Sequence, residues 1–307
     1  MLTTLSIGMP SAIPNGQMLL PMFDTEDINK NRHMDFLAFS KHAVSREVGI
    51  YDFVDESLVE IWSYTTPSSD DLVVGAVMGN FSGKNSHEIL LLCSAERETY
   101  LLLVDDINDP SSNKKISLKK NINVVDIKAI RWGSQGQDAF VIIGGVPNRN
   151  LMIGKIKNRG LEVIQTINNK TLSGSYGSIK VASGNIDRDK SNDLVVIINS
   201  NPSKIYQVRP NGSFKPIITT APRVRYIPDR LFDIDDDGID DIVFTTNNKL
   251  YYVNTLGTFS FPINDKLTSF FKSQDGLFAI NSSGEIIKFS LGPFGLEQIH
   301  KSKSYFF

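Results

Sequence analysis

Acidic and amide side chains recur in a nine-residue loop that is followed directly by an apolar run. The clearest example is the loop 233–241, which has carboxylates at its first, third, fifth and ninth positions: Asp233, Asp235, Asp237 and Asp241. Alternate side chains on a tight loop can turn toward a single point. Calcium binds about six to eight oxygen atoms from carboxylates, amides, backbone carbonyls and water. The spacing therefore predicts a calcium site in this loop.

Two further loops repeat this spacing of oxygen donors. In the loop 185–193 the donors are Asn185, Asp187, Asp189 and Asp193, and in the loop 27–35 they are Asp27, Asn29, Asn31 and Asp35. Weaker copies begin at Asn80 and Gly133. Because the number of carboxylates falls from four to three to two, we expect calcium affinity to decrease from the loop at 233 to the loops at 185 and 27.

The sixth and twelfth positions refine this interpretation. Gly238 at position six suits a left-handed turn, whereas Lys190 and Arg32 at the same position predict strain. An EF-hand has Glu at position twelve and then a helix. Here position twelve lies inside an apolar run, as Ala38, Val196 or Phe244. An EF-hand is therefore excluded.

The elements that position these loops form a repeat. The loops begin at residues 27, 80, 185 and 233, so the period is about fifty residues. One period has room for four short strands, expected at 180–184, 194–199, 204–208 and 214–219 in the clearest copy, with turn residues between them. Since no stretch shows a helical period, we expect very little helix.

Equal four-stranded units suit closure around an axis, which leaves only short, protected strand edges. We therefore predict an all-β fold, a β-propeller of about six four-stranded blades, with seven blades also possible. The propeller is expected to be a single domain, 1–307. Its expected blades are 16–75, 76–125, 126–177, 178–225, 226–268 and 269–303.

The segment 176–196 resembles the FG-GAP repeat of integrin α-subunit propellers and the related VCBS repeats. Tyr176-Gly177 stands where the family has Phe-Gly, and 233–241 matches the family's calcium loop at every position. The resemblance spans about 23–244. It implies a propeller with calcium between the first and second strands of a blade, on the face opposite the usual ligand face. Most copies lack the glycine at position six, and the last repeat has lost its acidic residues.

Composition excludes several classes of function. The net charge is −2, from 32 basic and 34 acidic residues, so we expect no nucleic-acid partner. No apolar run reaches the ~20 residues of a transmembrane helix, so no membrane insertion is expected. The single cysteine, Cys93, excludes an internal disulfide, and 1–14 lacks the features of a signal peptide. The four histidines are scattered, and neither a nucleophile elbow nor a P-loop is present.

Together these features predict a non-catalytic binding or adhesion module, stabilised by calcium and recognising a protein or glycan. Binding faces built from loops on a rigid scaffold commonly carry recognition. Extracellular calcium, at about millimolar concentration, would fill even weak sites, which favours an extracellular, cell-surface or periplasmic location. The absent signal peptide favours a cytoplasmic one. Two alternatives remain open: a carbohydrate-active enzyme similar to a polysaccharide lyase, and an intracellular scaffold subunit.

Overall fold

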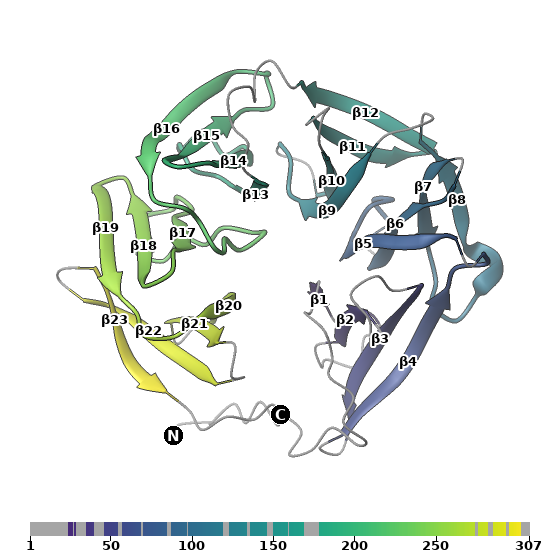
Figure 1. Cartoon of the computed structure of the whole chain (residues 1–307), viewed down its shortest axis with the longest axis horizontal. Coiled ribbons are helices and arrows are strands. Elements are labelled where there is room, and N and C mark those ends of the chain that lie inside the picture. The colour runs from purple at the N-terminus through teal and green to yellow at the C-terminus, as the bar shows by residue number, and fades with distance from the viewer. Residues whose placement is uncertain are drawn as a thin grey trace. The chain divides into compact units, whose positions relative to one another are not determined.

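The computed structural model of this chain is an all-β fold (Figure 1). The residues that it describes contain one 3-10 turn, η2 (Pro110–Ser112), and no α-helix. In the same residues, no helix is long and apolar enough to cross a bilayer. The prediction of an all-β chain is confirmed. The described residues are 24–26, 28, 35–39, 46–54, 57–68, 70–84, 87–96, 98–118, 123–133, 136–145, 150–158, 160–168, 178–273, 276–281, 285–292 and 295–301.

Within this part of the chain the strands form six antiparallel sheets, each made of strands consecutive in sequence. The chain divides into two compact units. The first unit contains two sheets. Their strands are β1 (Asp24–Glu26), β2 (Asp35–Phe39), β3 (Glu47–Val54) and β4 (Ser57–Thr65), then β5 (Leu72–Gly79), β6 (Glu88–Ser94), β7 (Thr99–Val104) and β8 (Lys114–Ser117).

The second unit contains three whole sheets and most residues of a fourth. The fourth is β9 (Val124–Ile130), β10 (Ala139–Gly144), β11 (Leu151–Lys157) and β12 (Gly160–Ile167). The others are β13 (Ser178–Gly184), β14 (Asp193–Asn199), β15 (Ser203–Val208) and β16 (Phe214–Ala221); β17 (Ile242–Thr245), β18 (Lys249–Asn254) and β19 (Gly257–Pro262); and β20 (Leu267–Ser273), β21 (Gly276–Asn281), β22 (Ile286–Gly292) and β23 (Gly295–Lys301).

Apolar cores form between consecutive sheets within each unit. The strand that follows an acidic loop, such as β6, β14 or β17, is buried along nearly its whole length because it is covered on both faces. For example, every residue of β14 is buried, whereas the outer strand β16 is mostly exposed or half-buried. This difference explains why the apolar run directly after each acidic loop is the clearest strand signal in the sequence.

The strands of the copy that begins at Ser178 lie where the sequence predicts them. The next copy differs, because 226–268 holds a three-stranded sheet where four strands were expected. Its first strand is replaced by isolated backbone pairs, Tyr226 with Thr245 and Phe232 with Asp241. Pro228 lies in this segment and lacks the amide hydrogen that a continuous ladder needs.

Candidate metal centre

The loop 233–241 is held closed at its two ends. The amide of Asp241 donates to the carbonyl of Phe232 at 2.7 Å, and the amide of Ile234 donates to Oδ2 of Asp241, also at 2.7 Å. Inside the loop, Asp236 and Gly238 have left-handed φ angles of 58° and 84°. The left-handed turn expected at Gly238 is confirmed. These two reversals curl the chain so that alternate side chains point inward.

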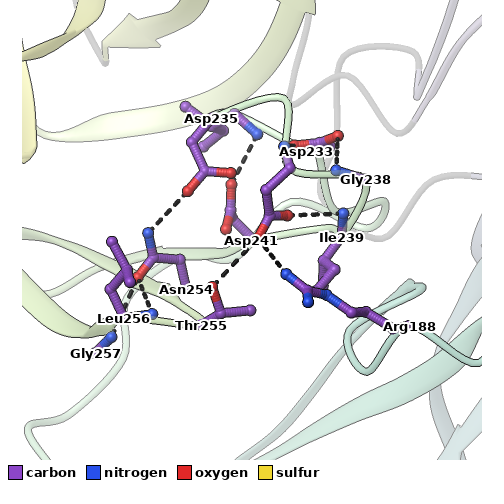
Figure 2. Close-up of polar contacts among 12 residues, drawn as sticks. Arg188, Asp233, Asp235, Gly238, Ile239, Asp241, Asn254, Thr255, Leu256 and Gly257 are labelled. Carbon is purple, nitrogen blue, oxygen red and sulfur yellow. Dashed lines mark hydrogen bonds and ion pairs between the residues drawn. The ribbon is translucent and has the colours of Figure 1, made fainter.

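Backbone amides of the loop fix its carboxylates (Figure 2). The oxygens of Asp233 accept from the amides of Asp237 at 3.1 Å and Gly238 at 2.9 Å, and Oδ1 of Asp237 accepts from Ile239 at 2.9 Å. Carboxylate oxygens of Asp233, Asp235 and Asp237 all lie within 4.8 Å of one another. Asp241, the fourth expected ligand, lies outside this group.

Two side chains of β18 complete the site. The hydroxyl of Tyr252 lies 3.1 Å from Oδ2 of Asp235 and 3.3 Å from Oδ2 of Asp241. Asn254 donates to Oδ2 of Asp235 at 2.9 Å (Figure 2). The other oxygen of Asp235, Oδ1, is buried and accepts no hydrogen bond from the residues that the structure describes. A buried carboxylate oxygen without a partner is unfavourable. The loop therefore fits a hard cation, which would coordinate this oxygen.

Burial and neighbouring negative charges raise the pKa of a carboxyl group in this loop. Burial, followed by the charges of Asp235 and Asp233, raises the pKa of Asp241 to about 7. Hydrogen bonds from Ile234 and Tyr252 oppose this increase without cancelling it. The carboxylates of a metal-free loop thus repel one another at neutral pH, and a divalent cation would relieve that repulsion.

The loop 185–193 has the same backbone shape, with Arg188 and Lys190 at φ 67° and 62° in the fourth and sixth positions. Because Lys190 is not glycine, this angle agrees with the strain predicted there. Oδ1 of Asn185 and Oδ1 of Asp193 are buried, and within the described part of the chain they accept no hydrogen bond. Burial raises the pKa of Asp193 to about 6, with Asp187 and Asp189 adding to the effect.

Gln207 in β15 and Arg209 directly after this strand contact the loop 185–193. Gln207 donates to Oδ2 of Asp187 at 2.7 Å and to Oδ2 of Asp193 at 2.8 Å. Arg209 forms an ion pair with Asp187. Among the described residues, Asp187, Asp189 and Asp193 do not gather into a group like that of Asp233, Asp235 and Asp237.

The loop 27–35 is described only in part. Asp27, Asn29 and Asn31 lie outside the described residues. Asp35 is fully buried, and its Oδ2 accepts from the amide of Ile28 at 2.8 Å. The same bond joins the second and ninth positions of the loop 233–241. The ninth position of this loop is therefore placed as it is in the clearest copy.

The described part of the weaker copy at Asn80 contains no cluster of three carboxylates like that of the loop 233–241. Its ninth residue, Glu88, accepts from the amide of Ser82 at 2.6 Å. Burial and a hydrogen bond with Asp105 raise the pKa of Glu88 to about 7. Lys84, at the fifth position, forms an ion pair with Asp105. A lysine stands here where the clear copies have an oxygen donor.

Sequence reasoning missed the third-strand residues that contact the loops: Gln207, Arg209, Tyr252 and Asn254. A signal for them exists. The segments Lys204-Ile-Tyr-Gln-Val-Arg209 and Lys249-Leu-Tyr-Tyr-Val-Asn254 align without gaps. Polar residues that differ between otherwise matching strands mark the positions facing each loop.

Neither a protein-family model nor a curated protein matches this sequence. Solved structures do match its fold. A crystal structure of BBS1N in complex with ARL6DN, soaked with mercury, has a TM-score of 0.59 at 11% identity and covers 96% of this chain and 84% of that chain. A lead-soaked crystal of the same complex gives 0.58 at 10% identity, over 92% and 87%. A protein from Lactobacillus plantarum gives 0.55 at 12% identity, over 87% and 81%.

Proposed function

We propose that this chain is a calcium-stabilised β-propeller of the FG-GAP type that binds a protein ligand and has no catalytic role. Its six antiparallel sheets, one for each repeat, would be the blades. The likeness to BBS1N supports this arrangement, and the ARL6DN bound to BBS1N supports a protein as the ligand. At these identities the ligand itself does not transfer to this chain.

One observation carries the calcium proposal. Oδ1 of Asp235 is buried without a hydrogen-bond partner, beside the carboxylates of Asp233 and Asp237. These three residues would hold the ion, with the buried carboxylate of Asp241 beside them. Calcium would supply positive charge there and fix the turn that leads into β17. The role is structural, because the ion would stabilise the scaffold that presents a binding face elsewhere.

Calorimetric titration of calcium into chelator-stripped protein tests the metal site. The Asp235→Asn variant should bind this calcium at least about tenfold more weakly, since it loses a charged ligand. Asp236→Asn is the matched control: Asp236 lies in the same loop, but its side chain is exposed and pairs with Lys272. Equal affinity of Asp235→Asn and the wild type, or no calcium binding by the wild type, would contradict the proposal.

The measured affinity also bears on location. A dissociation constant of about 10⁻⁴–10⁻³ M would suit an extracellular, cell-surface or periplasmic protein, which is the location we propose. A value near 10⁻⁷–10⁻⁵ M would instead suit an intracellular sensor. Titration at physiological magnesium separates these cases, because a hard-cation site with carboxylates can also take magnesium.

Screening of the calcium-loaded protein against arrays of proteins and of glycans tests the ligand class. We expect saturable binding to a protein and no turnover of uronate-containing polysaccharides in a lyase assay. Binding to glycans alone would replace the protein ligand with a sugar. Polysaccharide cleavage would show that the non-catalytic assignment is wrong.

A further inference from the structure

The acidic loops 185–193 and 233–241 differ in one residue that faces them. It is Arg209, just after β15, for the first loop and Asn254, at the end of β18, for the second. Leu194 pairs with Val208, and Ile242 pairs with Val253, so Arg209 and Asn254 occupy the same position opposite the ninth loop residue. Gln207 and Tyr252 are equivalent in the same way. Each of these two residues bridges the carboxylates at loop positions three and nine.

The contacts made by Arg209 and Asn254 are also equivalent, but their charges are not. Asn254 donates to Oδ2 of Asp235, the third loop position, at 2.9 Å. Arg209 makes an ion pair with Oδ2 of Asp187, the third position of its own loop. The loop 185–193 therefore contains a positive charge where the loop 233–241 contains a neutral amide.

The position of Arg209 makes this charge effective. Its side chain is 36% exposed, the Asp187 side chain is 16% exposed, and the Nε atom of Arg209 is buried. A half-buried charge pair interacts more strongly than one that is fully exposed on the surface. The guanidinium is also tethered by the strand, so it remains beside the loop at any calcium concentration.

The loop 233–241 has basic neighbours as well, but neither occupies the position of Arg209. Arg188, which is 68% exposed, donates to Oδ2 of Asp237 at 3.4 Å. Lys272 donates to the carbonyl of Asp233 and pairs with Asp236, whose side chain is 84% exposed. Exposed pairs of this kind contribute little and exchange readily with solvent ions. Neither cation contacts Asp235.

We propose that Arg209 is a built-in cation that takes the place of calcium in the loop 185–193, so that this loop stays folded without a metal ion. The proposal deepens the proposed function, on which it rests, by assigning calcium to the loop 233–241 and not to the loop 185–193. In the loop 185–193 the carboxylates of Asp187, Asp189 and Asp193 do not form a group like that of the loop 233–241 among the described residues.

The weaker loop at Asn80 provides a second instance in the first unit. There Lys84 stands at the fifth loop position and forms an ion pair with Asp105. Ile89 pairs with Val104, so Asp105 lies in the position that corresponds to Arg209 and Asn254. In that copy too, a cation from the protein lies among the carboxylates.

A reciprocal exchange tests the proposal by calcium titration of chelator-stripped protein. Arg209→Asn, which copies the residue of the calcium loop, should bind one calcium ion more than the wild type. Asn254→Arg should bind the calcium of the loop 233–241 at least about tenfold more weakly, so that one ion fewer is counted in the titration. Lys204→Asn is the matched control, because it removes a positive charge from an exposed position of the same strand, β15, and should leave the stoichiometry unchanged.

Thermal unfolding gives an independent measurement. Without calcium, Arg209→Asn should melt below the wild type, because Asp187 and Asp193 lose a positive neighbour. Saturating calcium should restore most of the lost melting temperature in the variant. In the wild type, it should have little effect on the loop 185–193. If Arg209→Asn does not fold without calcium, refolding it in calcium and dialysing the ion away measures the same dependence.

The outcomes separate this proposal from the one on which it rests. A wild type that binds no calcium at all would overturn the proposed metal function. A wild type whose calcium is lost in Asp235→Asn, together with an Arg209→Asn variant that gains none, would overturn the role of Arg209 alone. Loss of one calcium from the wild type on Asp193→Asn substitution would also overturn it.

Discussion

The amide of Asn185 donates a 2.7 Å hydrogen bond to Oδ2 of Asp240, which joins the first residue of one acidic loop to the eighth residue of the next. The amide of Asp240 returns a bond of 2.8 Å to the carbonyl of Asn185. Asp240 is half-buried, and its loss would remove the side-chain acceptor of the Asn185 amide. We expect Asp240→Ala to lower the free energy of unfolding by about 1–3 kcal/mol, measured by urea denaturation.

The conservative variant separates the hydrogen bond from the charge. Asp240→Asn keeps a side-chain acceptor for the Asn185 amide and should lose less stability than Asp240→Ala. Equal losses in the two variants would show that the negative charge, and not the hydrogen bond, joins the loops. No loss in either would show that the contact does not contribute to stability.

The acidic loops and the strands after them could be predicted because both signals are local. Oxygen donors at alternate positions and an apolar run next to them lie within about a dozen residues of sequence. The contacts of Asp240 and Arg209 could not be predicted in this way. Arg209 reaches Asp187 across a strand pair, and Asp240 reaches Asn185 in the preceding sheet. Such contacts depend on strand register and on which sheets are neighbours, and the repeat alone specifies neither.

Glycine should be favoured at the sixth position of both loops, because both positions have left-handed φ angles. Gly238 has φ 84° and open space where a Cβ atom would lie, so Gly238→Ala should cost about 1 kcal/mol through backbone strain alone. Lys190 has φ 62° at the equivalent position, and Lys190→Gly should stabilise by about 0.5–1 kcal/mol.

Gly136→Ala is a suitable control, because Gly136 also has open space at its Cβ position but no left-handed φ angle. It should change the free energy of unfolding by less than about 0.5 kcal/mol. All three variants can be compared by urea denaturation in calcium. A loss in Gly136→Ala as large as that in Gly238→Ala would contradict the strain argument.

Gly184, the last residue of β13, packs closely against Leu231 and against Asp240 near the end of the loop 233–241. A Cβ atom there would lie 2.8 Å from Cβ of Leu231 and 2.8 Å from Oδ2 of Asp240. We expect Gly184→Ala to destabilise by roughly 1–3 kcal/mol, because both neighbours must move. Gly160→Ala, whose nearest atom would be the Lys157 carbonyl at 3.5 Å, should be nearly neutral. Thermal melts of the two variants in calcium compare them directly.

The stability of the calcium-free protein should rise as the pH is lowered from 8 to 5. Burial and neighbouring carboxylates raise the pKa of Asp241 to about 7 and that of Asp193 to about 6. A raised pKa means that the folded protein binds the proton more tightly than the unfolded chain does. This contribution is fully present below the ordinary aspartate pKa and is lost as the pH rises through 6 and 7.

Calcium should reverse this dependence, because it binds carboxylates in their charged form. The difference in melting temperature between calcium and chelator should therefore be largest near pH 8 and should shrink toward pH 5. Asp241→Asn should flatten the curve measured in chelator, although Asp193 and Glu88 still titrate there. A calcium-free protein that instead loses stability steadily from pH 8 to pH 6 would show that these carboxylates do not repel one another in the folded state.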